Sequence, residues 1–140
     1  MHNGGISISF AWKDYLELAE ELSVVLDSEA KMRSSISRAY YASYCNVRNY
    51  MIEHDHNMIP KGESVHQYVI EYFWGFKRES KKTAKRREIA IILDRMKKRR
   101  IDADYEDCYP AANLVILNSQ TQKTLLESKR ILSIINTGSL

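Results

Sequence analysis

Apolar side chains between residues 29 and 52 recur at every third or fourth position. Those that follow this spacing are Ile36, Tyr40, Tyr44, Val47 and Met51. Such positions share one face of an α-helix, so the segment is predicted to be a helix with one buried face. Ala39, Ala42 and Ser43 lie in the same segment, and small side chains let a neighbouring helix approach closely. We therefore expect this helix to lie at the centre of a helical bundle.

The rest of the chain also favours helices over strands. Its 140 residues include five Gly and two Pro, fewer turn residues than an all-β sandwich needs. Apolar positions with helical spacing recur in residues 10–26, 64–76, 89–96 and 114–135. We predict an all-α, antiparallel bundle of about five helices in a single domain, with a core over about residues 10–135 and short disordered ends.

Some helix faces and ends can be predicted as well. In the first helix, the residues expected to face the core are Phe10, Tyr15, Leu18, Leu22 and Val25. Ser28 is placed to cap the start of the central helix. Ser64 and Gln67 have the spacing of a capping box for the third helix, and Pro110 suits the first turn of the last helix.

Several classes of protein are disfavoured by the sequence. No apolar run approaches the roughly 18 residues that span a bilayer, and the first residues lack the features of a signal peptide, so we expect a cytoplasmic protein without a membrane partner. Cys45 and Cys108 are isolated and are expected to be reduced thiols. The histidines lack zinc-site spacing and no glycine-rich phosphate loop occurs, so we expect no metal and no cofactor.

Positive charge is concentrated in residues 77–100, which we call the basic segment. It has twelve Lys and Arg against three Asp and Glu, a charge of +9, which leaves −6 for the remainder of a chain whose total is +3. Such a segment can bind the phosphates of RNA, or it can simply be a solvated helix face. The candidate RNA-binding residues are Lys81, Lys82, Lys85, Arg86, Arg87, Lys97, Lys98 and Arg99.

Part of the central helix resembles a known family. Residues 34–44 read SSISRAYYASY and are similar to the RSAISRAYYAAF signature of HEPN-domain proteins. Three further segments agree in the same order. Residues 12–19 are similar to the family's opening helix, residues 66–73 to its HxxVIxxF segment, and residues 100–105 to its R-N-x-A-D-Y turn.

The resemblance implies a HEPN-like helical bundle that dimerises. In many members it also implies a metal-independent ribonuclease with an R-x(4–6)-H motif, often a toxin encoded beside a nucleotidyltransferase-type antitoxin. The arginine of such a motif would hold the scissile phosphate, and the histidine would move the 2′-hydroxyl proton. We therefore expect a homodimer, with RNA and a nucleotidyltransferase-type antitoxin as candidate partners.

The aligned stretch departs from this motif. It begins at Arg100 but places Tyr105 where the histidine would stand, and tyrosine, with an ordinary pKa of about 10, is a poor proton acceptor at neutral pH. Arg100 and Tyr105 are therefore catalytic candidates, but both can also have structural roles. In the structural alternative Tyr105 fills a corner between helices, Arg100 stays in solvent, and Asp104 caps the last helix or pairs with Arg38.

A literal R-x(5)-H sequence joins Arg48 to His54. Six residues along a regular helix turn the side chain about 120° away from the starting face, so the two can converge only if the helix breaks near Glu53. The pair is a second set of catalytic candidates. The alternative is an arginine at a helix end and a histidine in a loop.

Arg38 stands among three tyrosines, Tyr40, Tyr41 and Tyr44. Tyrosines can form a platform on which RNA bases stack, but the spacing of Tyr40 and Tyr44 also suits core packing. We expect core packing, with Arg38 buried against an acidic group, either Asp104 or Glu29.

Two functions remain open from the sequence. The first is an RNA-related, toxin- or defence-type module with a degenerate ribonuclease motif, which binds RNA or a nucleotidyltransferase partner without cleaving. The second is an active metal-independent ribonuclease that cuts RNA through attack of the 2′-hydroxyl. The absent histidine in the aligned motif favours the first.

Overall fold

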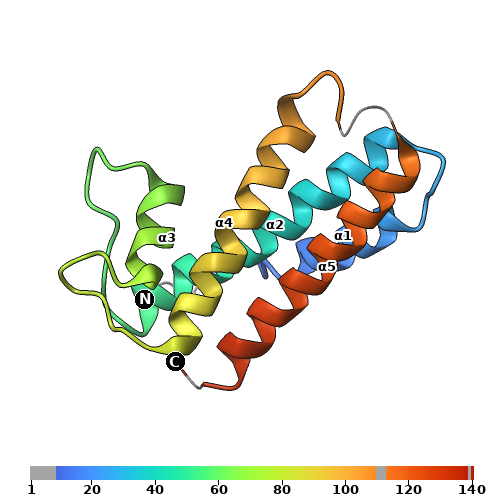
Figure 1. Cartoon of the computed structure of the whole chain (residues 1–140). Helices are drawn as coiled ribbons and strands as arrows, with labels where there is room; N and C mark the ends of the chain where they lie inside the picture. The colour runs from blue at the N-terminus through green and yellow to red at the C-terminus, as the bar shows by residue number, and fades with distance from the viewer. Residues whose placement is uncertain (1–8, 110–112, 139) are drawn as a thin grey trace.

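The computed structural model describes residues 9–109, 113–138 and 140, and within them every regular element is an α-helix. The helices are α1 (Asp14–Ser23), α2 (Glu29–Glu53), α3 (Val65–Trp74), α4 (Ala84–Tyr105) and α5 (Leu114–Asn136). The prediction of an all-α bundle of about five helices is confirmed (Figure 1).

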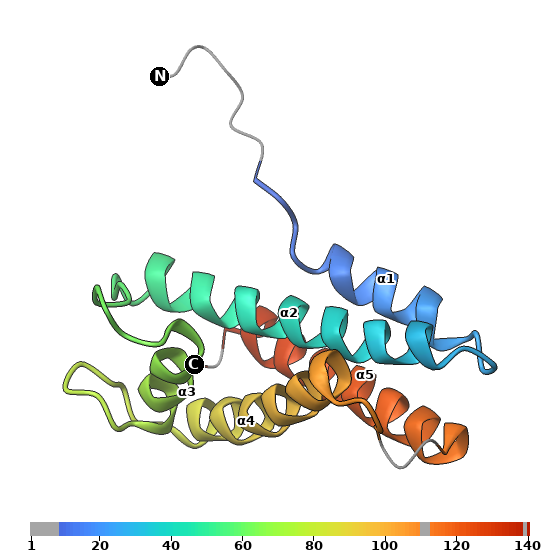
Figure 2. The same ribbon diagram turned by 90° about the horizontal axis from the view of Figure 1, so that it is seen from above.

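Helix α2 occupies the centre of the bundle and packs against each of the other four helices. Helices α1 and α4 run in the opposite direction to α2, whereas α5 runs in the same direction (Figures 1 and 2), so the prediction of an antiparallel bundle is wrong for α2 and α5. The short helix α3 and the two loops that flank it lie at one end of the bundle (Figure 2).

The predicted buried face of α2 is confirmed, because all five of its stripe residues are buried. Helix α5 lies against the small side chains of this helix, as expected. There the Ser43 hydroxyl donates to the Ser128 Oγ at 2.8 Å, and Ser128 donates to the backbone oxygen of Ala39. These two bonds satisfy hydroxyl groups at a helix contact that would be costly to bury unpaired.

The helix ends match the sequence only in part. Ser28 caps α2 as predicted, since its hydroxyl accepts from the backbone N–H of Lys31. Ser64 is the residue before α3, but its side chain makes no capping hydrogen bond, so the predicted capping box is wrong. Asn113, rather than Asp104, caps α5 with bonds to two backbone N–H groups. Pro110 lies outside the described residues.

The predicted inner face of α1 is wrong. The buried apolar residues of this helix are Leu16 and Ala19, whereas Leu18 is exposed. Phe10, Trp12 and Tyr15 pack their rings edge to face at centroid distances of 4.8 to 5.5 Å. These three rings therefore contact one another, with Phe10 exposed and with Trp12 and Tyr15 half-buried against the edge of the core.

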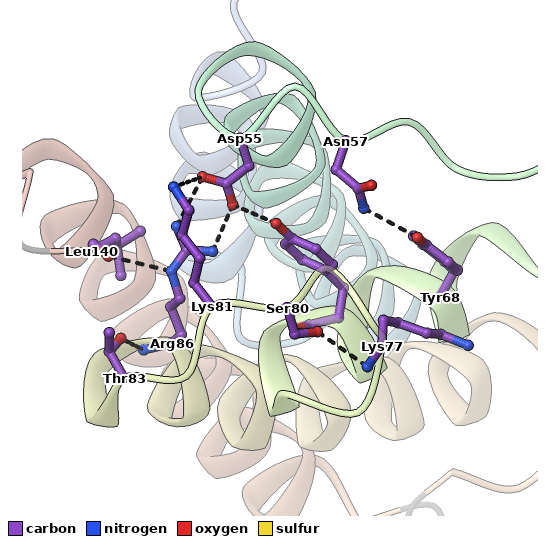
Figure 3. A network of polar contacts seen from close by, with 10 residues as sticks. Asp55, Asn57, Tyr68, Lys77, Ser80, Lys81, Thr83, Arg86 and Leu140 are labelled. Carbon is purple, nitrogen blue, oxygen red and sulfur yellow. Dashed lines mark hydrogen bonds and ion pairs between the residues drawn. The ribbon is translucent and has the colours of Figure 1, made fainter.

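The loop between α2 and α3 is fixed by a buried carboxylate (Figure 3). Asp55 accepts two hydrogen bonds from Arg86, at 2.6 and 3.0 Å, and one from the Tyr72 hydroxyl at 2.8 Å. Lys81 adds an ion pair at 3.4 Å from the solvent side. Burial alone would raise the pKa of Asp55, but the bonds from Arg86 and Tyr72 lower it below its ordinary value.

Two other expectations are tested by the structure. Cys45 and Cys108 are both free, as predicted. Among the described residues, no helix combines the length and the apolar character needed to cross a membrane.

Candidate functional site

A groove of about 480 Å³ opens where the start of α1, the middle of α2 and the start of α3 meet. Its walls combine arginine with aromatic side chains. The lining residues are Trp12, Tyr15, Arg38, Tyr41, Tyr44, Cys45, Arg48, Ile59, Val65 and His66. Among the described residues that line it there is no Asp or Glu, so the groove offers positive charge that no carboxylate within it neutralises.

Arg38 lies at one side of the groove. Its guanidinium carbon is 4.7 Å from the ring centre of Tyr15 and 5.4 Å from that of Tyr41, distances typical of a cation–π contact. The side chain is half-buried, and it donates to the neighbouring Ser37 hydroxyl at 3.4 Å. The predicted pairing of Arg38 with Asp104 or Glu29 is wrong, because both carboxylates pair with other arginines, and Asp104 also accepts from Ser37.

Arg48 has the same kind of surroundings. Its guanidinium carbon lies 5.8 Å from the ring centres of both Trp12 and Tyr44. Its Nε and Nη2 atoms donate to the side-chain oxygen of Asn49. Within the part of the chain that the structure describes, neither Arg48 nor Arg38 forms an ion pair.

His66 lies beside these arginines at the first turn of α3. Its Nδ1 is 2.7 Å from the Tyr40 hydroxyl, and its ring centre is 4.2 Å from that of Tyr44. Burial, together with the positive charges of Arg100, Lys97 and Arg48, lowers the pKa of His66 to about 4. The imidazole is therefore neutral at neutral pH, and three positively charged side chains lie around it.

Arg100 and Tyr105 do not form a site. Arg100 is 7% exposed, so the expectation that it stays in solvent is wrong. Its guanidinium lies over the rings of Tyr40 and Tyr41 and pairs with Asp104 at 3.7 Å. Tyr105 is 73% exposed at the last position of α4, so it does not fill a corner between helices either. A buried cation and an exposed phenol cannot act on one phosphate.

Arg48 and His54 are not brought together, although α2 does end at Glu53 as that pairing requires. His54 is exposed and stacks on Tyr50 at 4.3 Å. Arg48 instead faces the groove, where the histidine is His66.

Core packing and a platform for RNA bases are the two roles considered for the tyrosines, and Tyr40 fits the first whereas Tyr41 fits the second. Tyr40 is fully buried, as core packing requires, and burial raises its pKa. Tyr41 is half-buried and lines the groove, as a stacking platform requires.

The basic segment is partly offset by acidic partners, some within the segment and some from elsewhere in the fold. Arg86 is only 1% exposed, so the prediction that it contacts RNA is wrong. Arg99 pairs with Glu127 at 2.6 Å. The other candidates divide into Lys81, Lys85 and Lys98, which form ion pairs, Lys97, which donates to Gln67, and Lys82 and Arg87, which are exposed.

Sequence reasoning missed His66, Trp12 and Tyr15 as groove residues. A signal for the groove does exist in α2, since Arg38, Tyr41, Cys45 and Arg48 lie three, four and three residues apart and share one helix face. That His66 joins this face could not be read from the sequence, because α3 reaches it through tertiary packing.

The described residues contain no cluster of His, Cys, Asp or Glu that could hold a metal ion. Comparisons with protein-family models, with curated proteins and with solved structures find no match for this chain. The HEPN resemblance therefore stays a prediction, and the groove's own chemistry has to support any function.

Proposed function

We propose that the protein is an RNA-binding module, HEPN-like in fold, that holds single-stranded RNA in the groove. The observation that carries the proposal is the pair of arginines, Arg38 and Arg48, that lie on aromatic rings without a carboxylate partner. Six other arginines do form ion pairs within the described residues. The groove is thus a place where unpaired guanidinium groups gather.

The chemistry of the lining suits a nucleotide chain. A guanidinium binds phosphate oxygens through paired N–H donors. The half-buried ring of Tyr41 in the lining lets a base stack without regard to its sequence. Neutral His66 offers a further ring face and a ring nitrogen beyond the one near Tyr40.

Gel retardation of a labelled, unstructured RNA in EDTA tests this proposal. The wild type should retard the RNA, and Arg48→Met should weaken binding by about tenfold or more. Arg87→Met is the control, since Arg87 is likewise unpaired among the described residues but is exposed and lies outside the groove. Equal losses for the two variants would show only non-specific attraction to positive charge.

Cleavage is the second candidate function, because Arg48 and His66 line the same groove. If Nδ1 carries the ring proton and donates it to the Tyr40 oxygen, Nε2 has a lone pair that can accept the 2′-hydroxyl proton. A pKa of about 4 makes that nitrogen a weak base, which is why binding is preferred.

The two functions are separated by the RNA itself after incubation in EDTA. Cleavage should leave 2′,3′-cyclic phosphate ends, and His66→Gln should abolish it even at protein concentrations that bind all of the RNA. Intact RNA at every time point would leave binding alone.

The resemblance also leads us to propose a homodimer in a toxin- or defence-type system with a nucleotidyltransferase-type antitoxin. Exposed apolar side chains on α5, at Val115 and Leu126, support a surface for such an assembly. Sedimentation equilibrium should give twice the chain mass of 16.3 kDa. A monomer at all concentrations would contradict the dimer.

A further inference from the structure

The groove contains two similar arginine–aromatic units in series. In the first unit, Arg38 lies over Tyr15 of α1 and Tyr41 of α2. In the second unit, Arg48 lies over Trp12, just before α1, and Tyr44 of α2. Each unit thus combines one guanidinium with one ring at or near α1 and one ring on α2. The two rings near α1 are three residues apart in sequence, and so are the two rings on α2.

The two units adjoin each other along α2, since the rings of Trp12 and Tyr15, one from each unit, have centres 5.5 Å apart. Ten residues separate Arg38 from Arg48, which places their backbones about 15 Å apart along α2. Both side chains lean inward, since Arg38 reaches the ring three residues ahead and Arg48 the ring four residues behind. Their guanidinium groups therefore lie closer together than their backbones, yet each is held against its own pair of rings.

His66 lies between the units. Its ring centre is 6.0 Å from that of Tyr41 in the first unit and 4.2 Å from that of Tyr44 in the second. The neutral imidazole is therefore a flat, uncharged group next to both positively charged units. A ligand with charge at its two ends and an uncharged, planar group between them matches this order.

We propose that the groove binds two phosphates of one RNA strand, one at each arginine, with the intervening nucleoside over His66. This inference rests on the proposed RNA-binding function and makes it more specific. The ligand is then an oligonucleotide with at least two phosphates. In this arrangement a mononucleotide, with its single phosphate, occupies one unit and leaves the other unfilled.

A length series at constant salt tests the inference. The ligands are a 5′-phosphorylated mononucleotide, the corresponding dinucleotide with two phosphates, and a hexanucleotide, each competing with a fluorescent RNA. We expect the dinucleotide to bind about tenfold or more tightly than the mononucleotide, and the hexanucleotide to add less than that again. Arg38→Met and Arg48→Met should each reduce dinucleotide binding towards the mononucleotide level, whereas Arg130→Met, which removes a guanidinium paired with Glu88 outside the groove, should leave the length dependence unchanged.

The outcomes separate this inference from the proposed function. Equal affinity for the mononucleotide and the dinucleotide, with both lost in Arg48→Met, would overturn the two-phosphate arrangement and keep RNA binding. Absence of binding by all three ligands, or binding that neither groove variant changes, would overturn both. Circular dichroism of each variant checks that the helices are intact.

Discussion

Arginine side chains have opposite roles in two regions of the molecule, which are the buried ion pair at Asp55 and the groove beside His66. In the first region, Arg86 is 1% exposed and donates two hydrogen bonds to the buried carboxylate of Asp55 (Figure 3). In the second region, Arg38 and Arg48 lie against aromatic rings of the groove. Both arginines are half-buried and have no carboxylate partner within the described part of the chain. In the first region the carboxylate of Asp55 neutralises the guanidinium. In the second region the guanidinium groups can still bind an anionic ligand.

The difference shows that the partner of an arginine, and not its place in a charged run, indicates its role. Arg86 belongs to the basic segment but serves the fold, because breaking a buried pair leaves an uncompensated charge. Arg38 and Arg48 lie outside that segment, and their ring contacts contribute only modestly to stability. Loss of an arginine should therefore affect folding in one region and binding in the other.

The largest effect is expected from Asp55→Ala. Removing the carboxylate leaves Arg86 buried without its partner and should lower the free energy of unfolding by about 3–5 kcal/mol. Urea denaturation measures this change. The matched control is Asp94→Ala, which breaks an exposed pair with Lys98 and should cost about 0.5 kcal/mol or less. Similar losses in the two variants would contradict the structural role of Asp55.

The next largest effect concerns pH and His66. Its pKa in the fold, about 4, lies below its ordinary value of 6.5, so the unfolded chain takes up this proton first. The stability that neutral His66 contributes is thus complete above pH 6.5 and is lost as the pH falls towards 4. Between pH 7 and 4.5 the wild type should lose about 2 kcal/mol more than His66→Gln, measured by urea denaturation. Parallel pH profiles would show that the histidine is not held neutral.

A smaller effect on stability is expected from Arg48→Met. The methionine keeps much of the contact with Trp12 and Tyr44 but loses the cation–π attraction, so unfolding should change by about 1 kcal/mol or less. RNA binding should weaken far more. A loss of stability as large as that of Asp55→Ala would place Arg48 among the residues that hold the fold together.

The smallest change is expected from Arg48→Lys. Lysine retains the charge but not the planar donors that grip phosphate and lie flat on rings. RNA affinity should fall by about threefold, less than in Arg48→Met. Equal affinity for the lysine variant and the wild type would mean that charge alone binds the RNA.

The fold could be predicted further than the site because its signals are local. The buried face of α2 repeats along one segment, and repetition fixes both the helix and its inner side. The short α1 lacks such repetition, and its pattern points to Phe10 and Leu18 as core residues although Leu16 and Ala19 are the buried ones. A short amphipathic pattern leaves the choice of face to tertiary contacts.

The partners of the charged residues could not be predicted, because they come from distant parts of the chain. Asp55 and Arg86 are 31 residues apart, and Arg99 pairs with Glu127 on another helix. A motif search for arginine followed by histidine is local, so it selected His54 and overlooked His66. The groove is assembled from three helices, and only one of its faces, that of α2, is continuous in the sequence.

The central claim is that the groove arginines, and not the buried one, meet RNA. The most direct test follows the Nε–H signals of Arg38, Arg48 and Arg86 by nuclear magnetic resonance during titration with a short, unstructured RNA. We predict that the signals of Arg38 and Arg48 shift with a common affinity while that of Arg86 stays unchanged. Shifts confined to exposed arginines of the basic segment, such as Arg87, with the groove signals unmoved, would contradict the account.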